Sequence, residues 1–152
     1  MDERVWAPRV TVATVVYDNE RYLMVEEFDQ GRRVLNQPAG HLEPGERLPH
    51  AAVRETLEET GWEITLEAVL GASLFTNPDT GICYFRTSFL AQPVRHHPEQ
   101  ALDDGIIGAV WLTYAEILER QQDLRSESVM ASIQQHRSGR RYDLDYFYPQ
   151  AL

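Results

Sequence analysis

Residues 40–62 read GHLEPGERLPHAAVRETLEETGW, and they carry the clearest local structure signal in the chain. Pro49 suits the first turn of a helix, where its missing N–H has no partner to lose. Gly61 stands where a residue of left-handed conformation commonly ends a helix. The pattern therefore predicts a helix over residues 49–60, with a glycine-containing loop before it and a second loop after it.

Three carboxylates share one face of the predicted helix. At 100° per residue, Glu58 and Glu59 fall within about 60° of Glu55. The apolar Val53 and Leu57 fall on the opposite side, and we expect them to pack against a sheet. Arg54 precedes Glu58 by one turn, the spacing at which an arginine can pair with and orient a carboxylate.

A solvated acidic helix face is one interpretation of these carboxylates, and a metal site is the other. Like charges at such spacings repel by about 0.2–0.5 kcal/mol per pair. They also lie near the helix C-terminus, where the helix dipole disfavours anions. Mg²⁺, for which Mn²⁺ can substitute, takes oxygen ligands and shares them with substrate phosphates. The crowding therefore favours a divalent-cation site.

Composition excludes several classes of protein. The chain has 152 residues and a formal net charge of −10, which argues against nucleic-acid binding. All 14 basic residues are arginine, so lysine Schiff-base enzymes, pyridoxal phosphate enzymes and Walker A nucleotidases are excluded. Cys83 is the only cysteine, which excludes internal disulfides and multi-cysteine metal sites.

No segment of the sequence indicates a membrane or secretory destination. No apolar run approaches the roughly 20 residues of a membrane span. The N-terminus lacks the basic and apolar regions of a secretory signal. We therefore expect a cytoplasmic protein without membrane contact.

The remaining pattern predicts a single α/β (α+β) domain over residues 1–152, with a helix on each side of a sheet. Continuous or alternating apolar runs indicate strands, and capped amphipathic runs indicate helices. A polar loop is expected over residues 92–105. The expected strands cover residues 10–17, 22–25, 34–37, 64–75, 82–90 and 106–112, and the further helices cover residues 113–120 and 126–136.

The pattern Gly40-x5-Glu46-x7-Arg54-Glu55-x2-Glu58-Glu59 resembles the Nudix box, here residues 40–62. Thr56 is the one departure, because the family usually has an aliphatic residue there. The resemblance implies the Nudix fold, a mixed curved sheet sandwiched between helices with a loop–helix–loop catalytic motif. It also implies hydrolysis of nucleoside diphosphates linked to another group, with Mg²⁺ as cofactor.

The resemblance also assigns roles to residues. It implies that Glu58 and Glu59 are the main metal ligands, with the Gly40 carbonyl as a further one. Glu55 is a further ligand or the general base, and Arg54 holds the carboxylates in place. Because the base varies in the family, Asp103, Asp104 and Glu99 are candidates for a distal ligand or base, with solvated loop charges as the alternative.

Segments that lie wholly or partly outside the box resemble the phosphatase NudJ branch of the family. They are residues 36–43, 103–111, 124–126 and 138–142. This likeness implies release of phosphate from nucleoside tri- and diphosphates and from the hydroxymethylpyrimidine diphosphate of thiamine synthesis. It makes substrate-binding candidates of Asn36, Gln37, Asp103, Asp104 and Arg125.

Two other functions stay open on the sequence. A Nudix pyrophosphohydrolase would cut between the α and β phosphates of nucleotide sugars, dinucleotides or oxidised nucleotides. A non-catalytic module would bind a nucleotide without hydrolysing it, although such a sensor is expected to lose carboxylates that this chain keeps. In each case the partner is a small nucleotide or diphosphate, and we expect a monomer or a weak homo-oligomer.

Overall fold

A seven-stranded mixed sheet forms the centre of the protein in this computed structural model, which describes residues 4–148. The strand order is β3-β2-β1-β6-β5, with β4 paired to β1 and β7 paired to β2. Only β1 and β6 run parallel, and the other pairs are antiparallel. The strands are β1 (Arg9–Asp18), β2 (Arg21–Asp29), β3 (Arg32–Asn36), β4 (Ala39–His41), β5 (Trp62–Thr76), β6 (Cys83–His96) and β7 (Ile106–Thr113).

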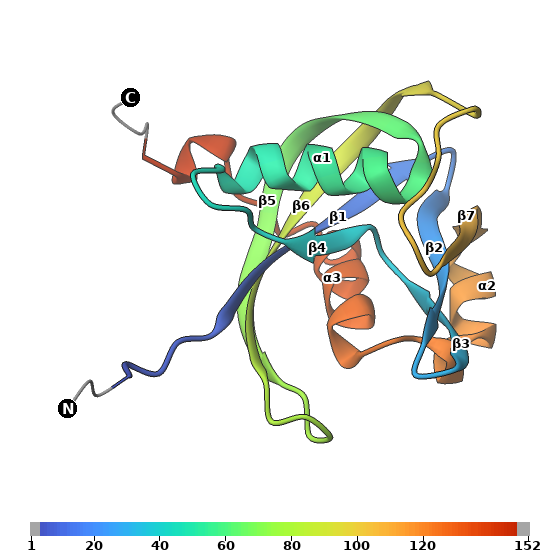
Figure 1. Cartoon of the computed structure of the whole chain (residues 1–152). Helices are drawn as coiled ribbons and strands as arrows, with labels where there is room; N and C mark the ends of the chain where they lie inside the picture. Colours follow the sequence, from blue (N-terminus) through green and yellow to red (C-terminus); the bar gives the residue numbers. More distant parts are fainter. Residues whose placement is uncertain (1–3, 149–152) are drawn as a thin grey trace.

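Two helices cover opposite faces of this sheet (Figure 1). Helix α1 (Leu48–Thr60) lies above the strands, and α3 (Glu127–Arg137) lies below them. The shorter α2 (Tyr114–Glu119) begins with the expected capping box, in which Thr113 and Glu116 exchange hydrogen bonds. The structure thereby confirms the predicted fold class, a sheet sandwiched between helices.

The alternating side chains of β1 explain why both faces are covered. Val12 faces α1 and packs with Ala51, Ala52 and Phe89, whereas Val15 faces α3 and packs in a second core. Because successive strand residues point to opposite faces, the continuous burial of residues 11–16 means that the strand is covered on both sides. The other members of the α3-side core include Leu90, Val129, Met130 and Ile133.

One local prediction was incomplete and another was wrong. Val53 packs against a sheet core that includes Val16 and Leu23, as expected, although Val53 and Leu57 are only half-buried. The most deeply buried side of α1 is the arc that includes Ala52, Thr56 and Glu59, where small side chains let the helix approach the sheet closely. The loop expected over residues 92–105 begins later, since β6 continues to His96 by pairing with Trp62 of β5.

The segment after α3 closes the outer edge of the sheet. Tyr142 forms an antiparallel bridge to Val69 of β5, and its backbone N–H and carbonyl both bond that residue. A short 3₁₀ turn η2 (Leu144–Tyr146) then brings Phe147 against Phe89, with ring centroids 5.9 Å apart. In the part of the chain that the structure describes, no helix is long and apolar enough to cross a membrane.

Candidate active site

The backbone around α1 fixes where its carboxylates lie. Pro49 lies in the first turn, and Gly61 ends the helix in the left-handed conformation at φ 73°, as expected. The Gly61 N–H donates to the Leu57 carbonyl, which satisfies one of the last carbonyls of the helix. The last turn of α1 is therefore held rigidly where it carries Glu58 and Glu59.

Arg54 is the hub of the acidic face. Its Nε and Nη2 donate to the two oxygens of Glu46 at 2.6 and 2.9 Å, a bidentate pair. Its Nη1 donates to Glu55 at 2.9 Å and to Glu58 at 3.0 Å. Hydrogen bonds from Glu46, then Glu55, raise the pKa of Arg54, so the guanidinium stays charged. One planar donor group thus orients two carboxylates of the cluster.

Gly40 lies directly against the Glu55 carboxylate. A Cβ at position 40 would lie 2.1–2.3 Å from the carboxyl atoms of Glu55, so a larger residue there would displace this carboxylate. Gly40 belongs to β4, a strand that sequence reasoning read as loop. Burial raises the pKa of Glu55 above the usual value for a glutamate. The close approach therefore places backbone and carboxylate together in a partly dehydrated site.

A loop from elsewhere in the chain completes the cluster. The Asp103 N–H donates to the Glu58 carbonyl at 3.1 Å, and the Gln100 side chain donates to the Leu57 carbonyl. These bonds pin the loop to the end of α1. One carboxylate oxygen from each of Glu55, Glu58 and Asp103 then lies within 4.8 Å of the others. Among residues 4–148 this is the one group of three or more acidic, histidine or cysteine side chains placed to hold a cation.

Glu59 lies apart from this cluster, on the sheet side of α1. Its side chain is buried, and its Oε1 accepts a hydrogen bond from the Ala39 N–H at 2.7 Å. Burial raises the pKa of Glu59 to about 8, with further upward contributions from the charges of Glu27, Glu55 and Asp103. An ionised Glu59 is therefore costly unless a cation lies nearby.

The substrate-binding candidates from the sequence divide into two groups. Asn36 and Arg125 both donate to Glu27, at 3.1 and 2.7 Å. Gln37 is buried and accepts hydrogen bonds from Arg86 and Ser132. Asp103 joins the carboxylate cluster, whereas the exposed Asp104 has no place in it. The sequence-based set thus lies partly in the core and partly at the cluster.

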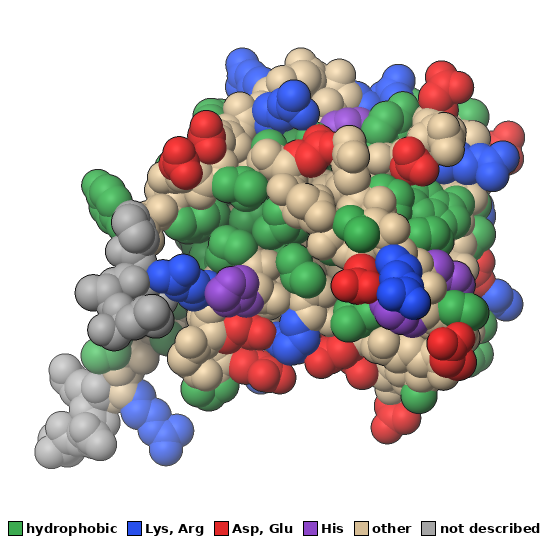
Figure 2. All heavy atoms as spheres, turned by 90° about the horizontal axis from the view of Figure 1, so that it is seen from above, with side chains coloured by type: hydrophobic (Ala, Val, Ile, Leu, Met, Phe, Trp, Pro, Cys, Tyr) green, Lys and Arg blue, Asp and Glu red, His purple; other side chains and the backbone are tan. Residues whose placement is uncertain are grey.

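Sequence reasoning missed Glu27. It is buried in β2, it binds Asn36 and Arg125, and its charge acts on Glu59. The available signal was the position of Glu27, which alternates with the apolar Leu23 and Val25 and so shares their face of the strand. Figure 2, which looks down on the α1 side, shows acidic side chains gathered around a basic one along one margin of this face.

This fold and box define a class of enzyme. The NUDIX domain family matches residues 7–133, and the chain belongs to this family. It is a Nudix hydrolase, an enzyme that acts on phosphoric anhydrides.

Individual relatives narrow the likeness. The chain is 38% identical over 138 residues to phosphatase NudJ of Escherichia coli strain K12, which covers 91% of this chain and 89% of that protein. A NUDIX hydrolase from Nitrosomonas europaea superposes with a TM-score of 0.92 at 41% identity, over 95% of this chain and 98% of that one. The NUDIX domain of Shewanella oneidensis NrtR, solved with ADP ribose, has a TM-score of 0.70 at 17% identity, over 91% and 92% of the chains. The last likeness shows the fold alone.

Proposed function

We propose that this protein is a Mg²⁺-dependent phosphohydrolase that releases phosphate from nucleoside tri- and diphosphates, and from hydroxymethylpyrimidine diphosphate. The carboxylate cluster of Glu55, Glu58 and Asp103, held by Arg54, is the observation that carries the proposal. The likeness to phosphatase NudJ supports phosphate release over other cleavage patterns.

The donor set fits a hard divalent cation. Three carboxylates within 4.8 Å of one another concentrate more negative charge than the one guanidinium of Arg54 balances, and all their donor atoms are oxygens. Glu55 and Glu58 would hold the cation with Asp103, the Gly40 carbonyl would add a backbone oxygen, and Glu59 would complete the site from the sheet side. When bound, Mg²⁺ neutralises phosphate charge and lowers the pKa of a coordinated water.

The protein groups have separate roles. Arg54 is a positioning residue, because its donors are occupied by carboxylates and by the His41 carbonyl. Glu55 and Asp103 are the candidates for accepting the proton of the attacking water. Arg125 is half-exposed, with 46% of its side chain accessible, and could also contact a phosphate. Phosphoryl transfer demands mainly such positioning and charge neutralisation.

A substrate panel tests the proposal. Nucleoside tri- and diphosphates, hydroxymethylpyrimidine diphosphate, a nucleotide sugar and a dinucleotide are each incubated with Mg²⁺ or with EDTA. Anion-exchange chromatography then identifies the products. Orthophosphate released only with Mg²⁺ supports the proposal, whereas monophosphate plus pyrophosphate identifies a pyrophosphohydrolase. Saturable binding without any turnover identifies a nucleotide-sensing module instead.

A further inference from the structure

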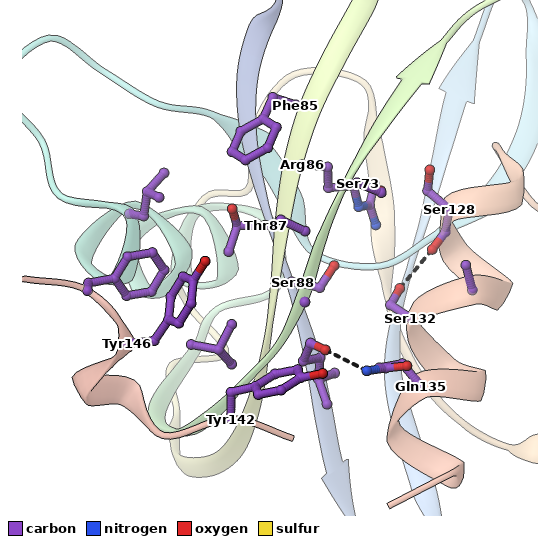
Figure 3. Close-up of a pocket in the computed structure, with 17 residues that line it drawn as sticks. Ser73, Phe85, Arg86, Thr87, Ser88, Ser128, Ser132, Gln135, Tyr142 and Tyr146 are labelled. Carbon is purple, nitrogen blue, oxygen red and sulfur yellow. Dashed lines mark hydrogen bonds between the residues drawn. The ribbon is translucent and has the colours of Figure 1, made fainter. Parts of the chain in front are cut away.

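A cavity of about 530 Å³, open to solvent, lies at the outer edge of the sheet. Its lining comes from the β5–β6 ribbon, the start of α1, α3 and the segment after α3, as Figure 3 shows. Phe85, Leu70 and Tyr142 form apolar wall, while Ser73, Ser128 and Gln135 offer polar groups. The volume is typical of a site for a small organic molecule. None of the described residues that line it is acidic.

Arg86 is the only charged side chain among the described residues of this wall. Its Nη2 donates to Gln37 Oε1 at 2.7 Å, but its Nε is buried and has no hydrogen-bond partner. Arg86 belongs to none of the ion pairs found among residues 4–148. Burial, and then the charge of Arg125, lower its pKa to about 10, which leaves it a cation near neutral pH. A buried donor of this kind needs an acceptor.

Gln37 fixes the guanidinium but cannot supply that acceptor. Its Oε1 accepts from Arg86 Nη2, and its Nε2 donates to the Val129 carbonyl. Ser132 Oγ lies 2.8 Å both from Gln37 Oε1 and from the Ser128 carbonyl, and its one hydrogen can serve either. The Nε of Arg86 has no hydrogen-bond partner in the part of the chain that the structure describes, Gln37 included. Gln37 holds the guanidinium of Arg86 in one orientation, while the Nε–H of Arg86 keeps no acceptor. An oriented, unpaired donor of this kind can bind an acceptor atom of a ligand.

The sheet register places Arg86 two strands away from β4. Arg86 of β6 pairs with Thr11 of β1, and Thr11 pairs with His41 of β4. Adjacent strands are about 4.8 Å apart, so Arg86 and His41 lie about 10 Å apart across the sheet. The charge of Glu59, the carboxylate that α1 turns toward the sheet, acts on the guanidinium of Arg86. A molecule with phosphates at the carboxylates of α1 could therefore extend its other end toward Arg86.

We propose that this cavity receives the heterocyclic end of the substrate, and that Arg86 recognises a carbonyl oxygen or ring nitrogen on it. The proposal rests on the proposed function, because it assigns the phosphates to the carboxylate cluster. A neutral, planar heterocycle with acceptor atoms matches a wall that is apolar and hydroxyl-lined, whose described residues include one cationic donor and no acid. The segment after α3, which lies beyond the matched family domain, supplies Tyr142 to this wall.

Kinetics measured on substrates with and without a heterocycle distinguish recognition of the ring from recognition of phosphate. Arg86→Lys is compared with Arg95→Lys, an exposed arginine on the same strand. We expect Arg86→Lys to lower kcat/KM for nucleoside diphosphates about tenfold or more and to leave kcat/KM for inorganic tripolyphosphate unchanged. Arg95→Lys should change neither. An equal loss on both substrates would show that Arg86 holds a phosphate, and would overturn the proposal.

A second variant tests the cavity without touching Arg86. Ala131 is exposed on α3 and lines the cavity, so Ala131→Trp narrows it from outside the core. We expect a higher KM for nucleoside diphosphates with folding and tripolyphosphate hydrolysis retained. Unchanged KM in this variant contradicts the assignment of the cavity.

A binding experiment keeps the test independent of turnover. The buried Nε–H of Arg86 gives an arginine side-chain NMR signal that Arg86→Lys removes, which assigns it. We expect this signal to shift when a nucleoside monophosphate is added to the wild-type protein and to stay in place with inorganic phosphate. If no nucleotide is hydrolysed but the shift occurs, the proposed function fails and the binding site stands. Absence of any shift at saturation overturns the site.

Discussion

The two faces of the sheet carry opposite excesses of charge. On the α1 side, Arg54 contacts four carboxylates, those of Glu43, Glu46, Glu55 and Glu58, so negative charge is in excess. On the α3 side, Arg86 lines a cavity without any acidic residue among its described walls, so a donor is in excess. Each region is incomplete alone. The contrast indicates one elongated substrate, whose phosphates are neutralised with a cation at one end and whose acceptor atoms meet Arg86 at the other.

The acidic end gives the largest expected effect. Glu58→Gln and Glu59→Gln each keep the side-chain shape and remove one negative charge from the site. We expect turnover at saturating Mg²⁺ to fall by orders of magnitude, each tenfold loss corresponding to about 1.4 kcal/mol of transition-state stabilisation. Glu119→Gln, at an exposed position of α2, is the matched control and should retain full turnover. Normal turnover of Glu59→Gln at low Mg²⁺ would show that Glu59 does not bind the metal.

The stability of the metal-free protein should depend on pH through Glu59, a carboxylate of the acidic end. Glu59 has a folded pKa of about 8 against an ordinary value of 4.5, so folding favours its protonated form. Its contribution to stability is therefore complete below pH 4.5 and is lost as the pH rises toward 8. The free energy of unfolding in EDTA should fall through this range by up to about 1.4 kcal/mol per pH unit from this group.

Urea unfolding at several pH values measures that slope. In Glu59→Gln the corresponding part of the slope should disappear, and the variant should be at least as stable as wild type at pH 8. Glu27, Glu55 and Asp103 act on Glu59, so Asp103→Asn should reduce the slope without removing it. An identical slope in wild type and Glu59→Gln would show that Glu59 is not the group that makes the stability depend on pH in this range. Mg²⁺ should stabilise wild type more than the variant, because only the ionised site binds it well.

Replacing Arg54 tests how much the orientation of the carboxylates contributes to Mg²⁺ binding and activity. Arg54→Lys keeps the positive charge but cannot bond Glu46, Glu55 and Glu58 in one plane. We expect activity or Mg²⁺ affinity to fall about 10–100-fold, the usual cost of removing a group that orients metal ligands. A Mg²⁺ titration of turnover measures it, with the exposed Arg140→Lys as control. A Mg²⁺ dependence equal to that of wild type would show that the carboxylates need no such orientation.

Local patterns predicted most of the fold and part of the site. The β-branched run of β1, the Pro49 and Gly61 ends of α1 and the capping box of α2 act over a few residues, so the sequence reveals them. Contacts between distant segments were not predictable in this way. The helical periodicity showed that Glu55, Glu58 and Glu59 share a face. It could not show that the sheet packs onto part of that face and buries Glu59.

The rest of the site follows from the same long-range packing. Asp103 reaches the cluster only because its loop bonds the end of α1, and Glu27 and Arg86 become neighbours of the site through strand pairing. Thr56 is a smaller example of this effect. It looked like a soft departure from the usual aliphatic residue, yet it is fully buried and bonded across to the sheet.

The smallest expected effect concerns this Thr56 contact between α1 and β1. Thr56 Oγ1 donates to the Ala52 carbonyl at 2.8 Å and lies 2.8 Å from Thr14 Oγ1. Since the one hydroxyl hydrogen of Thr56 is used, Thr14 must be the donor between them. Thr56→Val therefore leaves the buried Thr14 hydroxyl without an acceptor, whereas Thr14→Val leaves no donor unpaired.

The order of the three variants follows from that assignment. We expect Thr56→Val to lower the free energy of unfolding by about 1–2 kcal/mol, and Thr14→Val to lower it by less. The double variant should be no worse than Thr56→Val alone, because removing both partners leaves no buried donor without an acceptor. Urea unfolding of all three measures the order. If Thr14→Val proves the more damaging single change, the hydrogen bond runs the other way, and Thr56 does not serve as the acceptor that joins α1 to the sheet.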